Sequence, residues 1–268
     1  MKKILFTIIL LIILLFLYGS YIEPNRLKIN EYEIKNELIP SSFNDLKIVQ
    51  FSDLLYDKDN KKLDILKKKI NKLKPDIIIF TGNLFNNEYT YKDEDVNNLK
   101  DFLNNINAEL YKYAVIGNND KKLIDTYKDI LYETDFILLD NQSTLLFYKD
   151  ETPINIIGIT DNNFNDINSL LQSDIEYNYC LAITNKPDNV IKLNEYNINA
   201  VISGHSLGGI INIPFYGGII KMEGSKTYIN SYYKVNNTDL YISNGLGYKK
   251  FNFRLFNAPS INVYRFSN

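Results

Sequence analysis

The sequence predicts a single α/β domain behind an N-terminal membrane helix, and three observations lead to this prediction. A continuous apolar segment opens the chain directly after two lysines. Short apolar runs of strand length then alternate with amphipathic stretches of helical periodicity up to Gly208, and strand-like runs follow. Several of the apolar runs end in polar turns that contain glycine. With 268 residues, 45% of them apolar, the chain is long enough to bury one large core.

Composition excludes several classes of protein. The chain carries 30 Lys plus Arg against 32 Asp plus Glu, so its net charge of -2 argues against a dedicated nucleic-acid binder, and no nucleic-acid partner is expected. A single cysteine, Cys180, cannot form an internal disulfide or a structural zinc site. A single histidine, His205, excludes any metal site built mainly from imidazoles.

Residues 4–22 form an apolar run with few polar interruptions. As a helix, this run spans the roughly 30 Å hydrocarbon core of a bilayer. A cleaved signal peptide is the alternative, but the run ends without the small-x-small pattern of a cleavage site. We therefore expect an uncleaved anchor, residues 1–22, and a single-pass protein of the cell membrane. Lys2 and Lys3 favour a cytoplasmic N-terminus and an extracytoplasmic domain.

After the anchor, residues 23–45 are expected to connect it to one folded domain, residues 46–268, because no linker-like stretch or internal repeat divides the rest. The first strand is predicted at 47–51, followed by a helix at 63–73 whose apolar residues recur every three or four positions. A second helix is predicted near 96–106. Further strands are predicted at residues 76–80, 113–116, 137–139, 154–159, 179–183, 200–202, 210–213, 227–233, 240–243 and 261–266.

Turns with polar residues follow five of the apolar runs, at residues 52–55, 81–84, 117–120, 184–188 and 203–209, and three of these turns contain glycine. In open α/β sheets, functional groups collect in the loops at the carboxyl ends of the strands. The sequence therefore predicts a site assembled from many loops at one edge of the fold.

The order and spacing of these five turns resemble those of the calcineurin-like metallophosphoesterases, particularly their membrane-anchored bacterial branch. In that family the turns read D-x-H, G-D, G-N-H-D, an isolated H and G-H-x-H-G-G. The similarity extends to Gly245-Leu246-Gly247 and Arg254-Leu255-Phe256-Asn257 near the end of the chain. It implies a four-layer α/β/β/α sandwich that holds two divalent metals, and the family's activity is the hydrolysis of phosphoesters.

Carried over residue by residue, the resemblance shows that this sequence departs from the family at most metal-ligand positions. Three of the seven ligand positions keep the family's residue, namely Asp53, Asn118 and His205. The other four have changed, to Leu55, Asn83, Asn185 and Leu207. Of these, Asn83 stands where the family has the carboxylate that bridges its two metals. At the position of the family's catalytic histidine stands Asn119, although the following aspartate, Asp120, remains.

These departures predict a degenerate member of the family, with little or no phosphoester hydrolase activity and a ligand- or partner-binding role in the old cleft. The alternative is an active phosphoesterase that holds one weakly bound divalent metal, so the expected cofactor is either none or one such ion. Its remnant ligands would be Asp53, Asn83, Asn118, Asn185 and His205, through carboxylate, amide and imidazole donors. The sequence identifies neither a phosphoester ligand nor a protein partner.

Simpler interpretations of the retained residues also stand. Asp53 and Asp120 could be turn or cap residues that accept backbone N–H bonds. His205 follows the apolar run 200–202 and could be a hydrogen-bonded histidine at the end of a strand. Under these interpretations the loops keep their shape without any metal.

Overall fold

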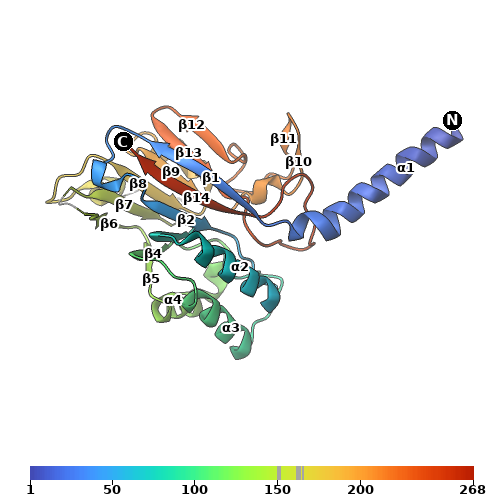
Figure 1. Ribbon diagram of the computed structural model, residues 1–268, viewed down its shortest axis with the longest axis horizontal. Helices are drawn as coiled ribbons and strands as arrows, with labels where there is room; N and C mark the ends of the chain where they lie inside the picture. The colour runs from blue at the N-terminus through green and yellow to red at the C-terminus, as the bar shows by residue number, and fades with distance from the viewer. Residues whose placement is uncertain (150–151, 161–163, 165) are drawn as a thin grey trace.

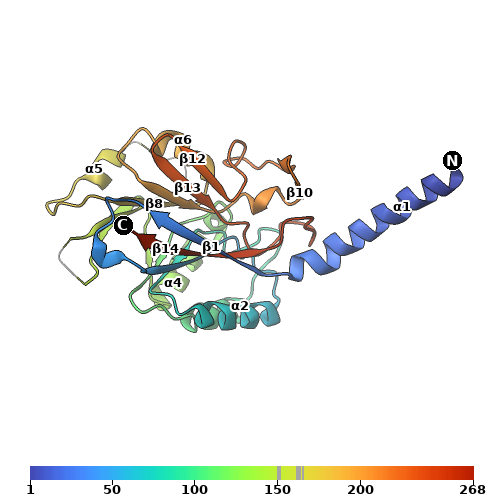
Figure 2. The ribbon, with the colours of Figure 1, turned by 45° about the horizontal axis from the view of Figure 1, so that its top comes forward.

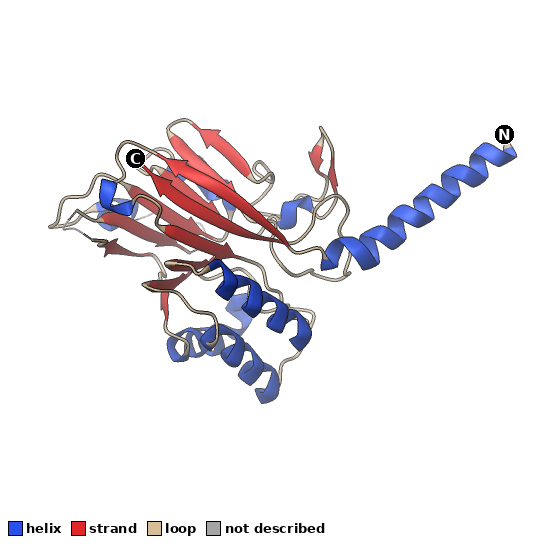
Figure 3. Cartoon of the chain, in the orientation of Figure 1, coloured by secondary structure: helices blue, strands red, loops and turns tan. Residues whose placement is uncertain are grey.

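The computed structural model describes residues 1–268 except 150–151, 161–163 and 165. Two six-stranded sheets stack on each other, and α1 (Lys2–Leu17) projects away from them (Figure 1). Helices cover the outer face of each sheet, and Figure 3 shows the larger ones gathered on one side. This arrangement is the four-layer α/β/β/α sandwich that the resemblance implied.

The first sheet has the order β1-β14-β2-β3-β4-β5. Strands β2 to β5 run parallel, while β14 pairs antiparallel with β2 and parallel with β1. Because the first sheet is covered on both faces, β3 near its centre is apolar throughout, with the sequence Ile-Ile-Ile-Phe. Its strands are β1 (Lys28–Lys35), β2 (Lys47–Phe51), β3 (Ile77–Phe80), β4 (Tyr111–Ala114), β5 (Phe136–Leu138) and β14 (Ser260–Ser267).

The second sheet has the order β12-β13-β9-β8-β7-β6. Its four central strands are parallel, and the edge strands β6 and β12 are antiparallel to their neighbours. A separate two-stranded hairpin, β10 with β11, lies outside both sheets. The strands are β6 (Gln142–Leu146), β7 (Ile154–Ile159), β8 (Cys180–Thr184), β9 (Ala200–Ser203), β10 (Asn212–Ile213), β11 (Gly217–Gly218), β12 (Tyr232–Val235) and β13 (Thr238–Ile242).

Three apolar cores separate the four layers. The first lies between the first sheet and α2 (Asn60–Leu73), α3 (Asp93–Asn104) and α4 (Ile124–Glu133). The second lies between the two sheets, and the third lies between the second sheet and two short helices, α5 (Ile167–Leu171) and α6 (Val190–Leu193). Each sheet therefore packs against another layer on both of its faces, and the strand-end loops of the two sheets lie at the same edge of the molecule.

Two strand predictions need correction. Of the strand predicted at 210–213, only the short β10 forms, because Ile210 adopts a left-handed backbone with φ of 59°. Of the strand predicted at 227–233, only its last two residues belong to β12. The residues before it form a loop, because the Asp188 carboxylate accepts backbone N–H bonds from Lys226, Thr227 and Tyr228 at 2.7 to 3.1 Å.

Strand β1 lies within the segment that the sequence analysis treated as a connection. Its eight residues pair in register with β14 and place it at the edge of the first sheet. Most of its side chains are polar and at least partly exposed, because an edge strand faces solvent on more than one side. Because β1 contains no run of consecutive apolar residues, the apolar pattern that predicts the other strands does not predict this one.

The N-terminal helix continues beyond α1 through a π-helical turn (Tyr18–Ile22) and a 3-10 turn (Glu23–Asn25). The whole segment Lys2–Asn25 has a mean hydropathy of 2.6 in its most apolar window, and its length and composition suit a membrane span. The C-terminal end of this helical segment packs on the domain. There, the backbone N–H of Arg254 donates a hydrogen bond to the backbone carbonyl of Gly19 at 2.9 Å. The rings of Phe16 and Phe253 stack at 5.8 Å. The helix is therefore attached to the domain by side-chain and backbone contacts as well as by the chain.

Candidate functional site

The carboxyl ends of β2, β3 and β9 bring three of the expected residues into direct contact. Asp53, Asn83 and His205 are all buried, with exposed fractions of 3% or less. The Asp53 carboxylate accepts hydrogen bonds from the Ser52 hydroxyl at 2.6 Å, the His205 backbone N–H at 2.8 Å and the Asn83 amide at 2.7 Å. These residues form one closed cluster, which links the first sheet to the second.

The side-chain amide of Asn83 occupies the centre of this cluster. Its Nδ2 group donates to Asp53 Oδ1 at 2.7 Å and lies 3.2 Å from His205 Nδ1. Its Oδ1 accepts the backbone N–H of Asn119 at 2.9 Å, and this bond fixes which end of the amide is oxygen. The amide therefore directs hydrogens, not a lone pair, at a carboxylate and an imidazole.

His205 is held as a neutral imidazole. Its Nε2–H donates to the backbone carbonyl of Glu223 at 2.8 Å, which leaves Nδ1 as the acceptor for Asn83. Burial lowers the pKa of His205, and the neighbouring Asp53 carboxylate opposes this shift. Lys249 is also close enough for its charge to lower the pKa of the imidazole.

Asp120 does not pair with the side chain of Asn119 through any hydrogen bond in the described part of the chain. Its carboxylate instead accepts four backbone N–H groups, from Asn83 and Gly117 on one oxygen and from residues 84 and 85 on the other. Burial raises the pKa of Asp120 to about 7, against the opposing effect of these donors. Asp120 therefore holds the 83–85 loop against the 117–120 loop.

Asn185 and Asn118 lie at the rim of the cluster. The Asn185 Nδ2 group donates to the backbone carbonyl of Thr81 at 2.6 Å, so this amide also joins the two sheets. Its Oδ1 is buried and has no hydrogen-bond partner among the described residues. Asn118 is half-buried, and no hydrogen bond within the described chain joins its side chain to the cluster.

The two leucines at expected ligand positions are both 1% exposed and apolar. Leu55 and Leu207 nevertheless have left-handed backbones, with φ of 44° and 47°. Asp53, Asn83 and His205 share this region, with φ between 49° and 66°. Such conformations cost about 1 kcal/mol or more for residues other than glycine. The loops therefore keep a strained shape at Leu55 and Leu207, the positions at which the resemblance placed metal ligands.

The sequence analysis missed the role of Arg254. Its buried guanidinium donates to the backbone carbonyls of Asn244 at 2.8 Å, Gly245 at 3.2 Å and Gly247 at 2.7 Å. Burial lowers the pKa of Arg254 to about 10. The segments quoted for the resemblance, 245–247 and 254–257, were the available signal, and the contact between them explains why both occur together.

Comparison with known proteins supports the similarity suggested by the strand-end turns. Residues 46–209 match the family described as calcineurin-like phosphoesterase. The chain belongs to this family. It is 32% identical to the uncharacterized metallophosphoesterase YkuE of Bacillus subtilis, over 92% of this chain and 88% of that protein.

Two further relatives align with this chain over nearly their whole length. One is the UDP-2,3-diacylglucosamine pyrophosphatase LpxG of Chlamydia muridarum, which is 25% identical over 94% of this chain and 93% of that protein. The other is the uncharacterized metallophosphoesterase YkoQ of Bacillus subtilis, which is 26% identical over 99% of this chain and all of that protein. These alignments extend the similarity well beyond residues 46–209, and the one with YkoQ reaches the N-terminal helix.

Members of the calcineurin-like phosphoesterase family normally use divalent metals, and the residues present here do not fit a pair of them. In the cluster, one carboxylate and one imidazole remain as strong ligands, and the Asn83 amide directs its hydrogens at both. A single cation would fit only if the Asn83 amide turned over, so that its oxygen faced the cation. The amide would then lose the hydrogen bond that its oxygen accepts from the Asn119 backbone N–H. The other possible ligands of such a cation would be the side chains of Asp53, Asn118, Asn185 and His205, and the buried Asn185 Oδ1 has no hydrogen-bond partner within the described residues.

Proposed function

We propose that this member of the family is a membrane-anchored binding protein that has lost two-metal phosphoesterase chemistry. The Asn83 amide carries the proposal, because its Nδ2 group contacts both Asp53 and His205 where a bridging carboxylate would be needed. Hydrogen bonds thus join the loops that metals join in an active enzyme. The strand-end loops keep their positive-φ backbone shape, and a groove lined in part by Leu207 lies beside them, which supports a role in binding a ligand.

Charge balance supports the same proposal. Two divalent cations bring a charge of about +4, which an active site offsets with several carboxylates. Here the only carboxylate of the described cluster is Asp53, and its two oxygens already accept three hydrogen bonds. A neutral amide in place of the bridging carboxylate removes the charge that would hold two cations together.

Metal analysis and turnover test this proposal together. We expect the full chain, purified in detergent with excess Mn²⁺ and then desalted, to retain far fewer than two ions per chain. Turnover of bis-p-nitrophenyl phosphate and of a nucleotide diphospho-sugar should not exceed that of a blank. The second substrate represents the pyrophosphate class named for the LpxG relative.

A rebuilt variant provides the positive control. It combines Leu55→His, Asn83→Asp, Asn119→His, Asn185→His and Leu207→His, which restore the family's residues on loops that keep their backbone shape. This variant should bind metal and gain phosphodiesterase activity, because metal ligands act as a unit. Two tightly held ions in the unmodified chain would contradict the proposal, as would turnover with one ion that Asp53→Ala abolishes.

We further propose that α1 is an uncleaved anchor and that the domain lies outside the cytoplasm, because Lys2 and Lys3 precede the apolar run. The full chain should sediment with membranes and resist extraction by alkaline carbonate. Protease added to intact spheroplasts should digest the domain, while a cytoplasmic marker protein stays whole. A soluble mature chain that begins near Tyr21 would identify a signal peptide instead, and a protected domain would reverse the orientation.

A further inference from the structure

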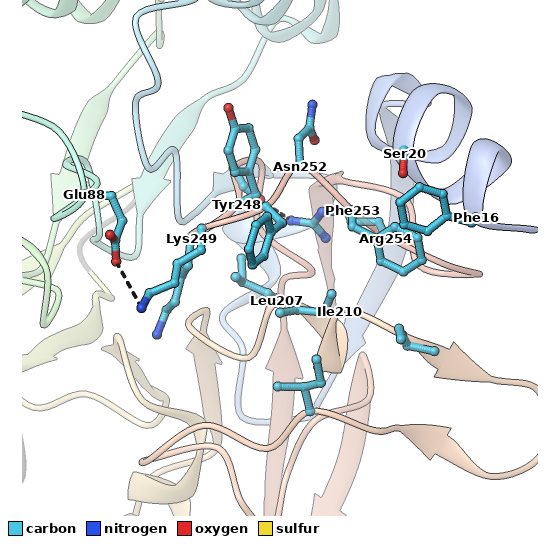
Figure 4. Close-up of a pocket in the computed structure, with 15 residues that line it drawn as sticks. Phe16, Ser20, Glu88, Leu207, Ile210, Tyr248, Lys249, Asn252, Phe253 and Arg254 are labelled. Atoms are coloured by element: carbon cyan, nitrogen blue, oxygen red, sulfur yellow. Dashed lines mark hydrogen bonds and ion pairs between the residues drawn. The ribbon is translucent and has the colours of Figure 1, made fainter.

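An apolar groove of about 750 Å³ lies between the membrane helix and the strand-end cluster. Figure 4 shows Phe16 and Ser20 of the N-terminal helix on one side of it, facing Phe253, and Leu207 and Ile210 below. The hairpin residues Ile211 and Ile220 complete its apolar lining. Its volume is in the range of small-molecule sites, roughly 300–1,000 Å³.

The membrane helix forms one wall of this groove. Phe16 belongs to the apolar span Lys2–Asn25, and its ring stacks on Phe253 at 5.8 Å. Gly19 allows this close approach, because a Cβ atom there would lie 2.5 Å from the Phe253 ring. A groove that shares a wall with a membrane span borders the bilayer, so its occupant can enter from the lipid phase.

Exposed apolar side chains surround the groove on the side of the helix. Phe215 and Tyr216, at the tip of the β10–β11 hairpin, are 111% and 78% exposed, and Phe251 of the neighbouring loop is 82% exposed. Both views of the ribbon show this hairpin projecting on the side from which α1 leaves the domain (Figure 2). Exposed aromatic side chains of this kind are typical of surfaces that contact lipid.

The far end of the groove carries charge. Lys249 and Lys250 line it, and the Lys250 ammonium lies 3.9 Å from the Glu88 carboxylate. Leu207, which lines the groove, lies two residues after His205 of the cluster. An occupant with an apolar tail and an anionic head therefore finds a matching surface at each end.

We propose that the groove binds an acyl chain of an anionic phospholipid drawn from the bilayer, with the lipid phosphate held by Lys249 beside the old cleft. The apolar side chains that line the groove contact the acyl chain, which enters the groove from the bilayer along the N-terminal helix. A lysine near a membrane surface contributes about 1 kcal/mol toward an anionic lipid, or about fivefold in affinity. This inference rests on the proposed retention of α1 as a membrane anchor, but it does not depend on the metal content of the site.

Photocrosslinking of the full chain in nanodiscs tests the proposal. The discs contain phosphatidylcholine and a small fraction of phosphatidylglycerol with a diazirine near the end of one acyl chain. Light should attach the probe to groove residues such as Ile211 and Phe253, which mass spectrometry locates. Labels confined to residues 2–15, the outer surface of the membrane helix, would overturn the proposal.

Matched variants separate the tail from the head group. Ile220→Lys should reduce groove labelling about fivefold, whereas Ile65→Lys on α2 should not, although Ile220 and Ile65 are similarly exposed at 42% and 53%. Lys249→Glu should remove the preference for the phosphatidylglycerol probe over a phosphatidylcholine probe, and Lys68→Glu should keep it. Equal effects of a variant and its control would overturn the corresponding part of the proposal.

Competition identifies the source of the phosphate. Excess glycerol phosphate in the buffer should leave groove labelling unchanged, because the tail supplies most of the binding. If this soluble phosphoester abolishes labelling, the groove does not select a lipid and the proposal fails. Metal binding or turnover measured as above leaves these outcomes unaffected, so the two proposals fail independently.

Discussion

Replacing Asn83 with Asp is expected to lower the free energy of unfolding by about 3–5 kcal/mol in metal-free buffer at pH 8. The change removes the amide that donates to Asp53 Oδ1 at 2.7 Å and puts a second carboxylate in its place. Two buried carboxylates so close repel each other, and His205 Nδ1 loses its donor as well. Denaturant unfolding of the full chain in detergent, followed by tyrosine fluorescence, measures the loss.

Exposed Asn237 offers the matched control, because Asn237→Asp makes the same chemical change away from the cluster and should cost little. Added Mn²⁺ should restore part of the stability of Asn83→Asp, since a carboxylate pair attracts a cation that binds only the folded chain. The metal should not stabilise the unmodified protein in this way. A variant as stable as the parent without metal would show that the amide is not a substitute for a cation.

Replacing Asp120 with Asn should destabilise the fold by a similar amount, about 3–5 kcal/mol. The Asp120 carboxylate accepts four backbone N–H groups from two loops, and an amide would turn its own hydrogens toward two of those donors. The stabilities of Asp120→Asn and the parent should be compared at pH 8. Burial raises the pKa of Asp120 to about 7, so the carboxylate is ionised at that pH.

The exposed Asp125 of α4 provides the control, and Asp125→Asn should change the free energy of unfolding by less than about 0.5 kcal/mol. Hydrogen exchange should also show faster exchange at the amides of residues 83–85 in Asp120→Asn than in the parent. Equal stability of Asp120→Asn and Asp125→Asn would mean that the loops are held together by other contacts.

Much of the fold could be predicted because a buried parallel strand consists largely of consecutive apolar residues, which are visible in the sequence. The prediction of β7 at residues 154–159 agrees with the structure to the residue, and the central strands β2, β3, β8 and β9 lie at or within one residue of their predicted positions. The strand-end loops followed from the same runs. The contact of Asp53, Asn83 and His205 could therefore be expected from the resemblance before any coordinates.

The rest depends on information that the local sequence does not carry. The direction of the Asn83 amide is set by the Asn119 backbone N–H, 36 positions away. Asp188 turns a strand-like run into a loop by binding the backbone of residues 226–228, 38 to 40 positions further along. The edge strand β1 is polar because solvent covers much of it, so no apolar pattern marks it. Arg254 acts on carbonyls, which every residue type has.

The continuous N-terminal helix has a consequence for how the protein meets other molecules. The helical segment ends at Asn25 and β1 begins at Lys28, so only residues 26–27 separate the proposed membrane span from the first strand of the domain. A domain on a long linker explores a volume, and its encounters depend on the reach of that linker. With the helix retained in a bilayer as proposed, this domain would move with it and stay close to the membrane surface. Its encounters would then depend on surface density in two dimensions, and molecules that diffuse in the same membrane would meet the domain near the membrane surface.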